Sequence, residues 1–328
     1  MVAYILRRLL LATVTVGVIS ALSFVIIKLP PGDYVTSYIA EMEAGGGTVS
    51  RAEAEAMRHQ LGLDQPLYVQ YGKWMGRLLR GDFGVSLEYR RPVVDVIGDR
   101  LWTTITLSFT ALCFTWVLAL PIGVYSAAHQ YSVGDYVLTC IGFVGVAVPG
   151  FLLALVMLYA SFVLFNAKVG GLFSPAYLDA PWSPARAWDL AKHLPLPALL
   201  LAVSGIAQTM RIMRANLLDE LRKPYVTTAR AKGLSATRAL LKYPVRVALN
   251  PFVSTVGYSL PYIVSGSIIV SIVLNLPTVG PLLVTALLAQ EMFLAGAIIL
   301  MLGVMTVVGT LASDLLLMWV DPRIRLEG

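Results

Sequence analysis

Long apolar stretches alternate with polar segments along the whole chain. A transmembrane helix needs about 20 consecutive, mostly apolar residues to cross a hydrocarbon core roughly 30 Å thick. Six stretches reach about that length, at residues 9–29, 103–125, 137–165, 194–212, 252–274 and 292–320. The pattern therefore predicts an all-α integral membrane protein with six transmembrane helices.

Two of these stretches carry local features that refine the prediction. The first ends in Lys28 and Leu29 and is followed by two prolines. This is not the small-residue site that a signal peptidase cleaves, so we expect the stretch to remain as the first span. The third contains Pro149 and Gly150, and we expect a break there. Such breaks are tolerated where neighbouring helices or a cavity satisfy the freed backbone groups.

The spacing of the stretches predicts three regions. Residues 1–30 hold the N-terminus and the first transmembrane helix, residues 31–101 form a polar external cap, and residues 102–328 form a five-helix core with a long loop at 213–250. Long loops cross the membrane regardless of their charge, which is why the cap is placed outside. Within the cap, Ser50 and Glu53 form a capping-box pattern that predicts a helix to about Leu61.

The loop at 213–250 is the one strongly basic segment of the chain. Residues 211–246 contain nine Lys or Arg and two acids. A central Lys or Arg costs roughly 2.5 to 3.5 kcal/mol in a membrane helix, so this segment is a loop, and its charge predicts a cytoplasmic position. With Arg7 and Arg8 before the first span, this places both chain termini in the cytoplasm.

Two short helices joined at a glycine are expected inside this loop. Pro224 suits a helix start, and Gly233 suits the position where the backbone leaves the helix. Ser235 can cap a second helix over residues 236–242. Small residues among the charges predict a surface that docks closely against another protein; a solvated loop that only sets the topology is the alternative.

Composition agrees with a membrane protein and excludes several classes of function. The chain is 57% hydrophobic and 13% charged, and its net charge of +6 is concentrated in a few loops. We therefore expect contact with membrane lipid and none with nucleic acid. No phosphate-binding loop occurs, and the three histidines lie outside the predicted spans. Asp314 is the one acid within them, without the partner an aspartyl protease needs. No catalytic residue, metal site or cofactor is predicted on this chain.

Polar residues in the fourth and fifth spans have two interpretations. They either pack helices together by hydrogen bonding or line a wet pathway for a hydrophilic solute. On the second interpretation the pathway residues are Gln208, Ser259, Ser267 and Ser271.

The basic loop resembles the cytoplasmic loop of ABC importer permeases, and TARAKGLS at residues 228–235 resembles its form in dipeptide and oligopeptide permeases. Residues 31–33 (PGD), 61–66 (LGLDQP) and 81–84 (GDFG) resemble the same family. The resemblance implies the type I ABC importer permease fold in a bacterial cytoplasmic (inner) membrane. It implies that coupling to an ATPase involves Thr227, Thr228, Ala229, Ala231, Lys232, Gly233 and Leu234.

The same resemblance implies the partners and the function. The partners are a second homologous permease subunit, two ATPase subunits that carry ATP and Mg²⁺, and an external substrate-binding protein. The chain would form half of the pathway for di- or oligopeptides, with nickel chelates or haem also within the range of the family. The alternative is an ATP-independent secondary transporter or channel, although the two halves of the chain show none of the matching interrupted spans that such transporters often have.

Overall fold

The computed structural model describes residues 2–166, 170–178, 180–252 and 268–320, with the side chains of 2–7, 9, 165 and 313–320 left aside. The chain divides into two compact units. The first unit comprises residues 1–103 and 278–308, and the second comprises residues 104–277 and 309–328. The boundaries predicted at residues 30 and 101 divide the chain into consecutive regions, whereas each compact unit combines separate segments. The predicted boundaries therefore stay a prediction.

The first unit consists of helices and one short pair of strands. Its elements are α1 (Val2–Lys28), α2 (Tyr34–Ala44), α3 (Arg51–Leu61), α4 (Leu67–Leu78), β1 (Val85–Ser86), β2 (Arg91–Pro92), the beginning of α5 (Val93–Ala128), α15 (Val279–Leu288) and most of α16 (Met292–Val320). The strands β1 and β2 pair antiparallel, with Val85 opposite Pro92. The chain is thus helical apart from this two-residue ladder within the described residues.

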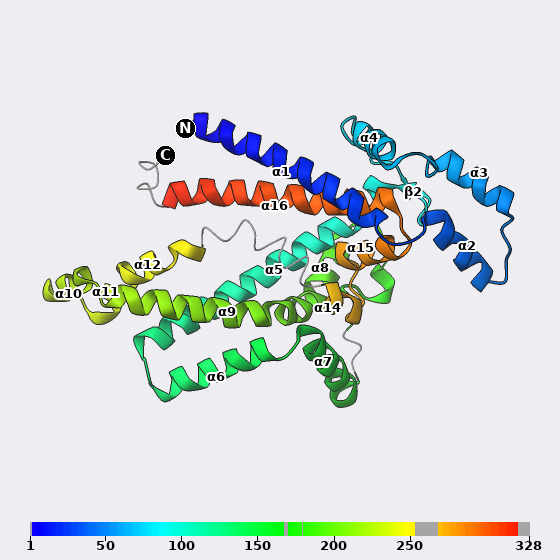
Figure 1. The fold of residues 1–328 in the computed structure, drawn as a ribbon. Coiled ribbons are helices and arrows are strands. Elements are labelled where there is room, and N and C mark those ends of the chain that lie inside the picture. Colours follow the sequence, from blue (N-terminus) through cyan, green and yellow to red (C-terminus); the bar gives the residue numbers. More distant parts are fainter. Residues whose placement is uncertain (1, 167–169, 179, 253–267, 321–328) are drawn as a thin grey trace. The chain divides into compact units, whose positions relative to one another are not determined.

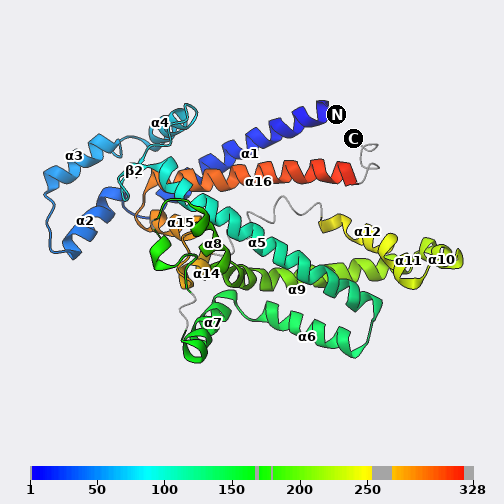
Figure 2. The same cartoon turned by 180° about the vertical axis from the view of Figure 1, so that it is seen from behind.

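Close side-chain contacts join α1, α4 and α16. Figure 1 and Figure 2 show α1 and α16 side by side, and at Gly303 of α16 a side chain would come within 3.0 Å of Ile19. Trp74 of α4 stacks near Phe24 of α1, with ring centroids 6.2 Å apart. The same indole leaves room only for a glycine at Gly296 of α16, where a Cβ would lie 2.7 Å away. The cap helix α4 is therefore packed onto the two apolar helices.

Capping hydrogen bonds begin the first two cap helices. Ser50 accepts from the Glu53 N–H, and the Glu53 carboxylate accepts from the Ser50 N–H at 2.8 Å, which confirms the predicted capping box and the helix to Leu61. Asp33 begins α2 in the same way through Thr36. Gly62 ends α3 in the left-handed conformation, the usual place for glycine after a helix.

An element that the sequence pattern did not predict lies at the centre of the first unit. The ten-residue helix α15 is apolar but too short to cross a membrane. Its Val279, Leu282 and Ala286 are buried in one apolar cluster with residues of α5 and α16. This segment between the predicted fifth and sixth spans thus forms part of the core, because neighbouring elements cover its apolar face.

The second unit holds the remaining helices. Its elements are the rest of α5, α6 (Val133–Ala147), α7 (Gly150–Phe165), the 3₁₀ turn η1 (Pro175–Tyr177), α8 (Pro184–His193), α9 (Pro195–Leu221), α10 (Pro224–Ala231), α11 (Ala236–Lys242), α12 (Pro244–Ala248) and α14 (Ile268–Val273). The predicted break is present, because α6 and α7 meet at Val148 and Pro149 with a bend of 100°.

Four described helices are long and apolar enough to cross a membrane, namely α1, α5, α9 and α16, and the bent pair α6 and α7 could make a fifth span. Of the expected fifth span, residues 253–267 lie outside the described residues and only α14 near its end is seen. The count of six therefore stays a prediction.

The helix α9 packs closely against α5 and α6 in the second unit. A Cβ at Gly123 of α5 would lie 2.7 Å from the Met213 side chain and 2.9 Å from the Met210 carbonyl oxygen of α9. Only glycine leaves room for that approach. Small residues serve this purpose at membrane helix contacts, where close packing replaces the hydrophobic effect as the driving force.

Replacing Gly123 by alanine is expected to destabilise the second unit by about 1 to 3 kcal/mol, the usual cost of an overpacked contact. Thermal unfolding of the detergent-solubilised protein would measure it. Gly98→Ala is the matched control in the same helix, since nothing lies within 4 Å of a Cβ there. Equal melting temperatures for the two variants would contradict the close contact.

Candidate functional site

The candidate site is the basic hairpin, defined here as α10, α11 and α12 with their connections (residues 222–248), which follows the end of α9 (Figure 1). Both predicted helices are present, with α10 over Pro224–Ala231 and α11 over Ala236–Lys242. Ser235 occupies the N-cap position of α11, but its hydroxyl makes no capping hydrogen bond.

Gly233 makes the turn between the two helices. Its φ of +86° lies in the left-handed region, which a side chain disfavours. The Gly233 N–H donates to the Arg230 carbonyl at 2.9 Å, and the Leu234 N–H donates to the Ala229 carbonyl at 3.3 Å. These are the two hydrogen bonds of a Schellman motif, which satisfies the last carbonyls of α10.

The residues predicted to couple to an ATPase fall into two groups. Ala229 is 7% exposed, so its methyl group packs inside the hairpin. Leu234 is half-buried. The other five are exposed on the surface of the basic hairpin: Thr227, Thr228, Ala231, Lys232 and Gly233. The structure thus gives Ala229 a packing role, while docking by the exposed residues stays a prediction.

A shallow groove on α11 adds residues that the sequence reasoning did not select. Besides the predicted Leu234, it is lined by Thr237, Arg238, Leu241 and Lys242. Leu241 is 56% exposed, so the groove has an apolar part beside two cations. Periodicity could have identified this face, because these positions recur at helical spacing along α11.

Apolar contacts and one hydrogen bond connect the basic hairpin to α9. Met213 and Leu217 of α9 are fully buried in a cluster with Ala248 of α12 and Phe252. The Tyr225 hydroxyl of α10 donates to Glu220 near the end of α9. Burial, together with this hydrogen bond, raises the pKa of Tyr225 to about 12, so the phenol remains a donor at neutral pH. The hairpin is therefore attached to the end of α9 by both apolar and polar contacts.

A buried ion pair fixes the same part of α9 to α6. Arg214 donates from Nε to Asp135 Oδ1 at 2.9 Å and from Nη2 to Oδ2 at 2.7 Å. Asp135 is 2% exposed and also accepts from the Tyr131 N–H at 3.0 Å. The sequence reasoning missed Asp135, because its predicted third span began at residue 137. The spacing of Ser132 and Asp135, a helix N-cap pattern, was the available signal.

The four predicted pathway residues are only partly within the described residues, since Ser259 and Ser267 lie outside them. Gln208 is exposed on α9. Ser271 is 0% exposed in α14, and its hydroxyl has no partner among the described residues. The Ser271 hydroxyl therefore forms no hydrogen bond with Gln208, and a shared pathway role stays a prediction. The side chain of Asp314 likewise lies outside the described part of the chain.

A buried carboxylate in the first unit was also missed. Glu291, just before α16, is 0% exposed, and its Oε1 accepts from the Leu87 N–H at 2.7 Å. Its Oε2 has no partner among the described residues. Burial raises the pKa of Glu291 above its ordinary value, although hydrogen bonds from Ser86 and two backbone N–H groups oppose that rise. The carboxylate ties the loop after β1 to the start of α16.

Breaking the ion pair between α6 and α9 by Arg214→Met is expected to cost about 3 kcal/mol, because it leaves a buried carboxylate uncompensated. That value is the low end of the range for buried pairs, since the Arg214 side chain is 26% exposed. Thermal unfolding in detergent measures it, and Arg222→Met at an exposed position is the control. Adding Asp135→Leu to Arg214→Met should recover most of the loss; no recovery would show that the pair is not the cause.

Because the pKa of Glu291 is raised, the stability of the folded protein is expected to depend on pH. The folded state retains a proton that the unfolded state releases at the ordinary pKa of 4.5, so stability falls as the pH rises from there toward the folded pKa. Glu291→Gln keeps the acceptor oxygen and should flatten this dependence. Melting temperatures across that range, with Glu43→Gln as the exposed control, would test it. The same slope in wild type and Glu291→Gln would contradict it.

Comparison with known proteins gives full-length similarity to one kind of membrane protein. The family described as "Binding-protein-dependent transport system inner membrane component" matches residues 119–326, and its N-terminal companion matches residues 1–108. The chain is 35% identical to the oligopeptide transport system permease protein AppB of Bacillus subtilis and 32% identical to the glutathione transport system permease protein GsiC of Escherichia coli. Each alignment covers 99% of both chains.

A solved structure shares the fold. The inward-facing MetNI methionine ABC transporter matches with a TM-score of 0.54 at 16% identity, over 69% of this chain and 96% of that one. At this level of identity the likeness concerns the fold alone.

Proposed function

The chain belongs to the family of binding-protein-dependent transport system inner membrane components, and we propose that it forms half of the translocation pathway of an ATP-driven importer for di- or oligopeptides. Family membership makes it a multi-pass inner membrane protein and the permease of such a system, not its ATPase. The full-length match to relatives named for oligopeptide and glutathione transport is the observation that carries the peptide assignment.

The predicted all-α fold of a type I importer permease is confirmed, while the count of six spans stays a prediction. The described part of the chain is mostly helical, with four to five apolar spans, and it resembles a type I importer permease in three dimensions. The fold supplies a passage and no energy source, because the sequence has no phosphate-binding loop. ATP and Mg²⁺ therefore belong to partner subunits.

The basic hairpin is the proposed docking surface for the ATPase. Its exposed face offers small residues at Ala231 and Gly233, and the groove on α11 offers Leu241 between cations. A partner with a small apolar pocket and an acidic rim complements that surface. The position of Gly233 in a Schellman turn keeps this face compact, so the docked helices move as one piece with α9.

The remaining partners follow from the family. A second, homologous permease completes the passage, two ATPases close on ATP, and an external binding protein delivers the solute. Positive charge in the basic hairpin and at Arg7 and Arg8 supports a cytoplasmic position for both termini. The chain contacts lipid and takes no part in nucleic-acid binding.

The free energy that drives transport comes from a ligand that binds one conformation of the transporter more tightly than the other. Moving a transporter from 1:99 to 99:1 in favour of one conformation takes about 5.5 kcal/mol of differential binding. Closure of the ATPases supplies this energy, and the contacts of the hairpin with α9 carry it to the spans. Gln208, Ser259, Ser267 and Ser271 are the proposed hydrogen-bonding positions along the passage.

Ala231→Trp is expected to uncouple transport, because a large side chain at an exposed, closely docked position weakens the contact with the ATPase by about tenfold or more. ATP-dependent uptake of a labelled tripeptide and co-purification of the ATPase should fall together. Ala56→Trp in the cap is the matched control, also exposed. Ala229→Arg is unsuitable, since Ala229 is buried and its replacement would disrupt the hairpin itself.

The alternative, a secondary transporter or channel, predicts transport without ATP. Proteoliposomes that hold the two permeases without ATPases should not accumulate the tripeptide on a proton or sodium gradient. Accumulation under those conditions, or unchanged uptake by Ala231→Trp, would overturn the ATP-driven assignment. Parallel uptake of a nickel chelate and of haem would settle which solute class is carried.

A further inference from the structure

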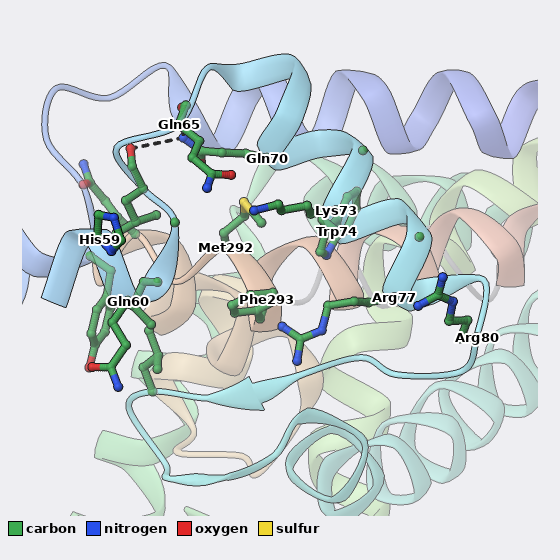
Figure 3. Close-up of a pocket in the computed structure, with 18 residues that line it drawn as sticks. His59, Gln60, Gln65, Gln70, Lys73, Trp74, Arg77, Arg80, Met292 and Phe293 are labelled. Atoms are coloured by element: carbon green, nitrogen blue, oxygen red, sulfur yellow. Dashed lines mark hydrogen bonds between the residues drawn. The ribbon is translucent and has the colours of Figure 1, made fainter. Parts of the chain in front are cut away.

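A cavity of about 520 Å³ lies within the first unit, between the turn after α3, the helix α4 and the start of α16. Figure 3 shows Gln70, Lys73, Trp74 and Arg77 reaching from α4 toward Met292 and Phe293. This volume falls in the range of small-molecule sites, roughly 300 to 1,000 Å³. Its lining includes no residue of the basic hairpin and neither Gln208 nor Ser271.

The charge of the cavity wall is positive. Lys73, Arg77 and Arg80 recur at helical spacing along α4 and its end, and the lining residues include no Asp or Glu. Arg77 is partly neutralised, since its Nε donates to Asp82 at 2.8 Å. Its guanidinium lies 5.5 Å from the ring centre of Phe293. Lys73 and Arg80 form no ion pair within the described residues, so they remain available to an anion.

Two deeply buried polar atoms in the wall have no partner among the described residues. They are the indole N–H of Trp74, whose side chain belongs to a residue 2% exposed, and the Oε1 of Gln70, a residue 7% exposed. The Gln70 amide is fixed, because its Nε2 donates to the Leu63 and Gln65 carbonyls at 3.2 Å and 2.7 Å. A buried donor and a buried acceptor without partners are costly, which calls for a ligand that offers both.

We propose that this cavity binds the C-terminal end of a short peptide. Lys73 and Arg80 hold the carboxylate, the Trp74 N–H donates to a peptide carbonyl, and Gln70 Oε1 accepts from a peptide N–H. Met292 and Phe293 supply the apolar wall for a side chain. The choice of peptide as ligand rests on the proposed function; the cations, the donor and the acceptor are features of the cavity itself.

The experiment measures equilibrium binding of labelled trialanine and of trialanine amide to the whole transporter complex in phosphatidylcholine nanodiscs, without ATP or binding protein. The unmodified tripeptide should bind more tightly than the amide. Lys73→Gln with Arg80→Gln should weaken its binding about tenfold or more, since a charge-assisted hydrogen bond is lost. Trp74→Phe should weaken both peptides alike. Arg51→Gln, an exposed cation of α3, is the matched control.

Each other outcome overturns the inference. No binding, equal affinity for trialanine and its amide, or no change in Lys73→Gln with Arg80→Gln would exclude a peptide carboxylate site. Loss of trialanine binding in nanodiscs that contain phosphatidylglycerol would instead identify a lipid headgroup site. ATP-dependent uptake by the wild-type complex is measured separately, so failure of the cavity and failure of the importer assignment are distinguishable.

Discussion

The contact of α9 with its neighbours is the constraint on which the second unit depends. Arg214 and Asp135 pair in a site from which solvent is largely excluded, and Gly123 lets the backbone of α9 approach α5. Specific contacts of this kind matter for a membrane helix, because lipid is as apolar as the side chains it would replace. Together they hold α9 in register against α5 and α6.

The helices of the basic hairpin form through local backbone preferences, and packing attaches the hairpin to α9. Pro224 and Gly233 begin and end α10 through backbone effects that need no tertiary contact. The buried cluster of Met213, Leu217 and Ala248 then attaches the hairpin to α9. The hairpin is consequently a preformed surface, which limits the conformational entropy lost if the proposed ATPase docks there.

The first unit depends on polar groups held in apolar surroundings. Trp74 fills the space left by Gly296, and Glu291 draws the loop after β1 toward α16. Both leave a polar atom without a partner in the described residues. Each such atom costs free energy, so the partnerless Trp74 N–H in the wall of the cationic cavity is better explained by binding than by packing.

The sequence by itself determined the long apolar helices α1, α5, α9 and α16, the break at Pro149, the capping box at Ser50 and the two helices around Gly233, because length, proline and glycine act locally. It also indicated the family, through short motifs. Tertiary structure alone decided that α15 is core, that Asp135 pairs with Arg214 across 79 positions, and that Ala229 faces inward. These outcomes depend on which distant residue covers a given side chain, and no local pattern along the chain contains that information.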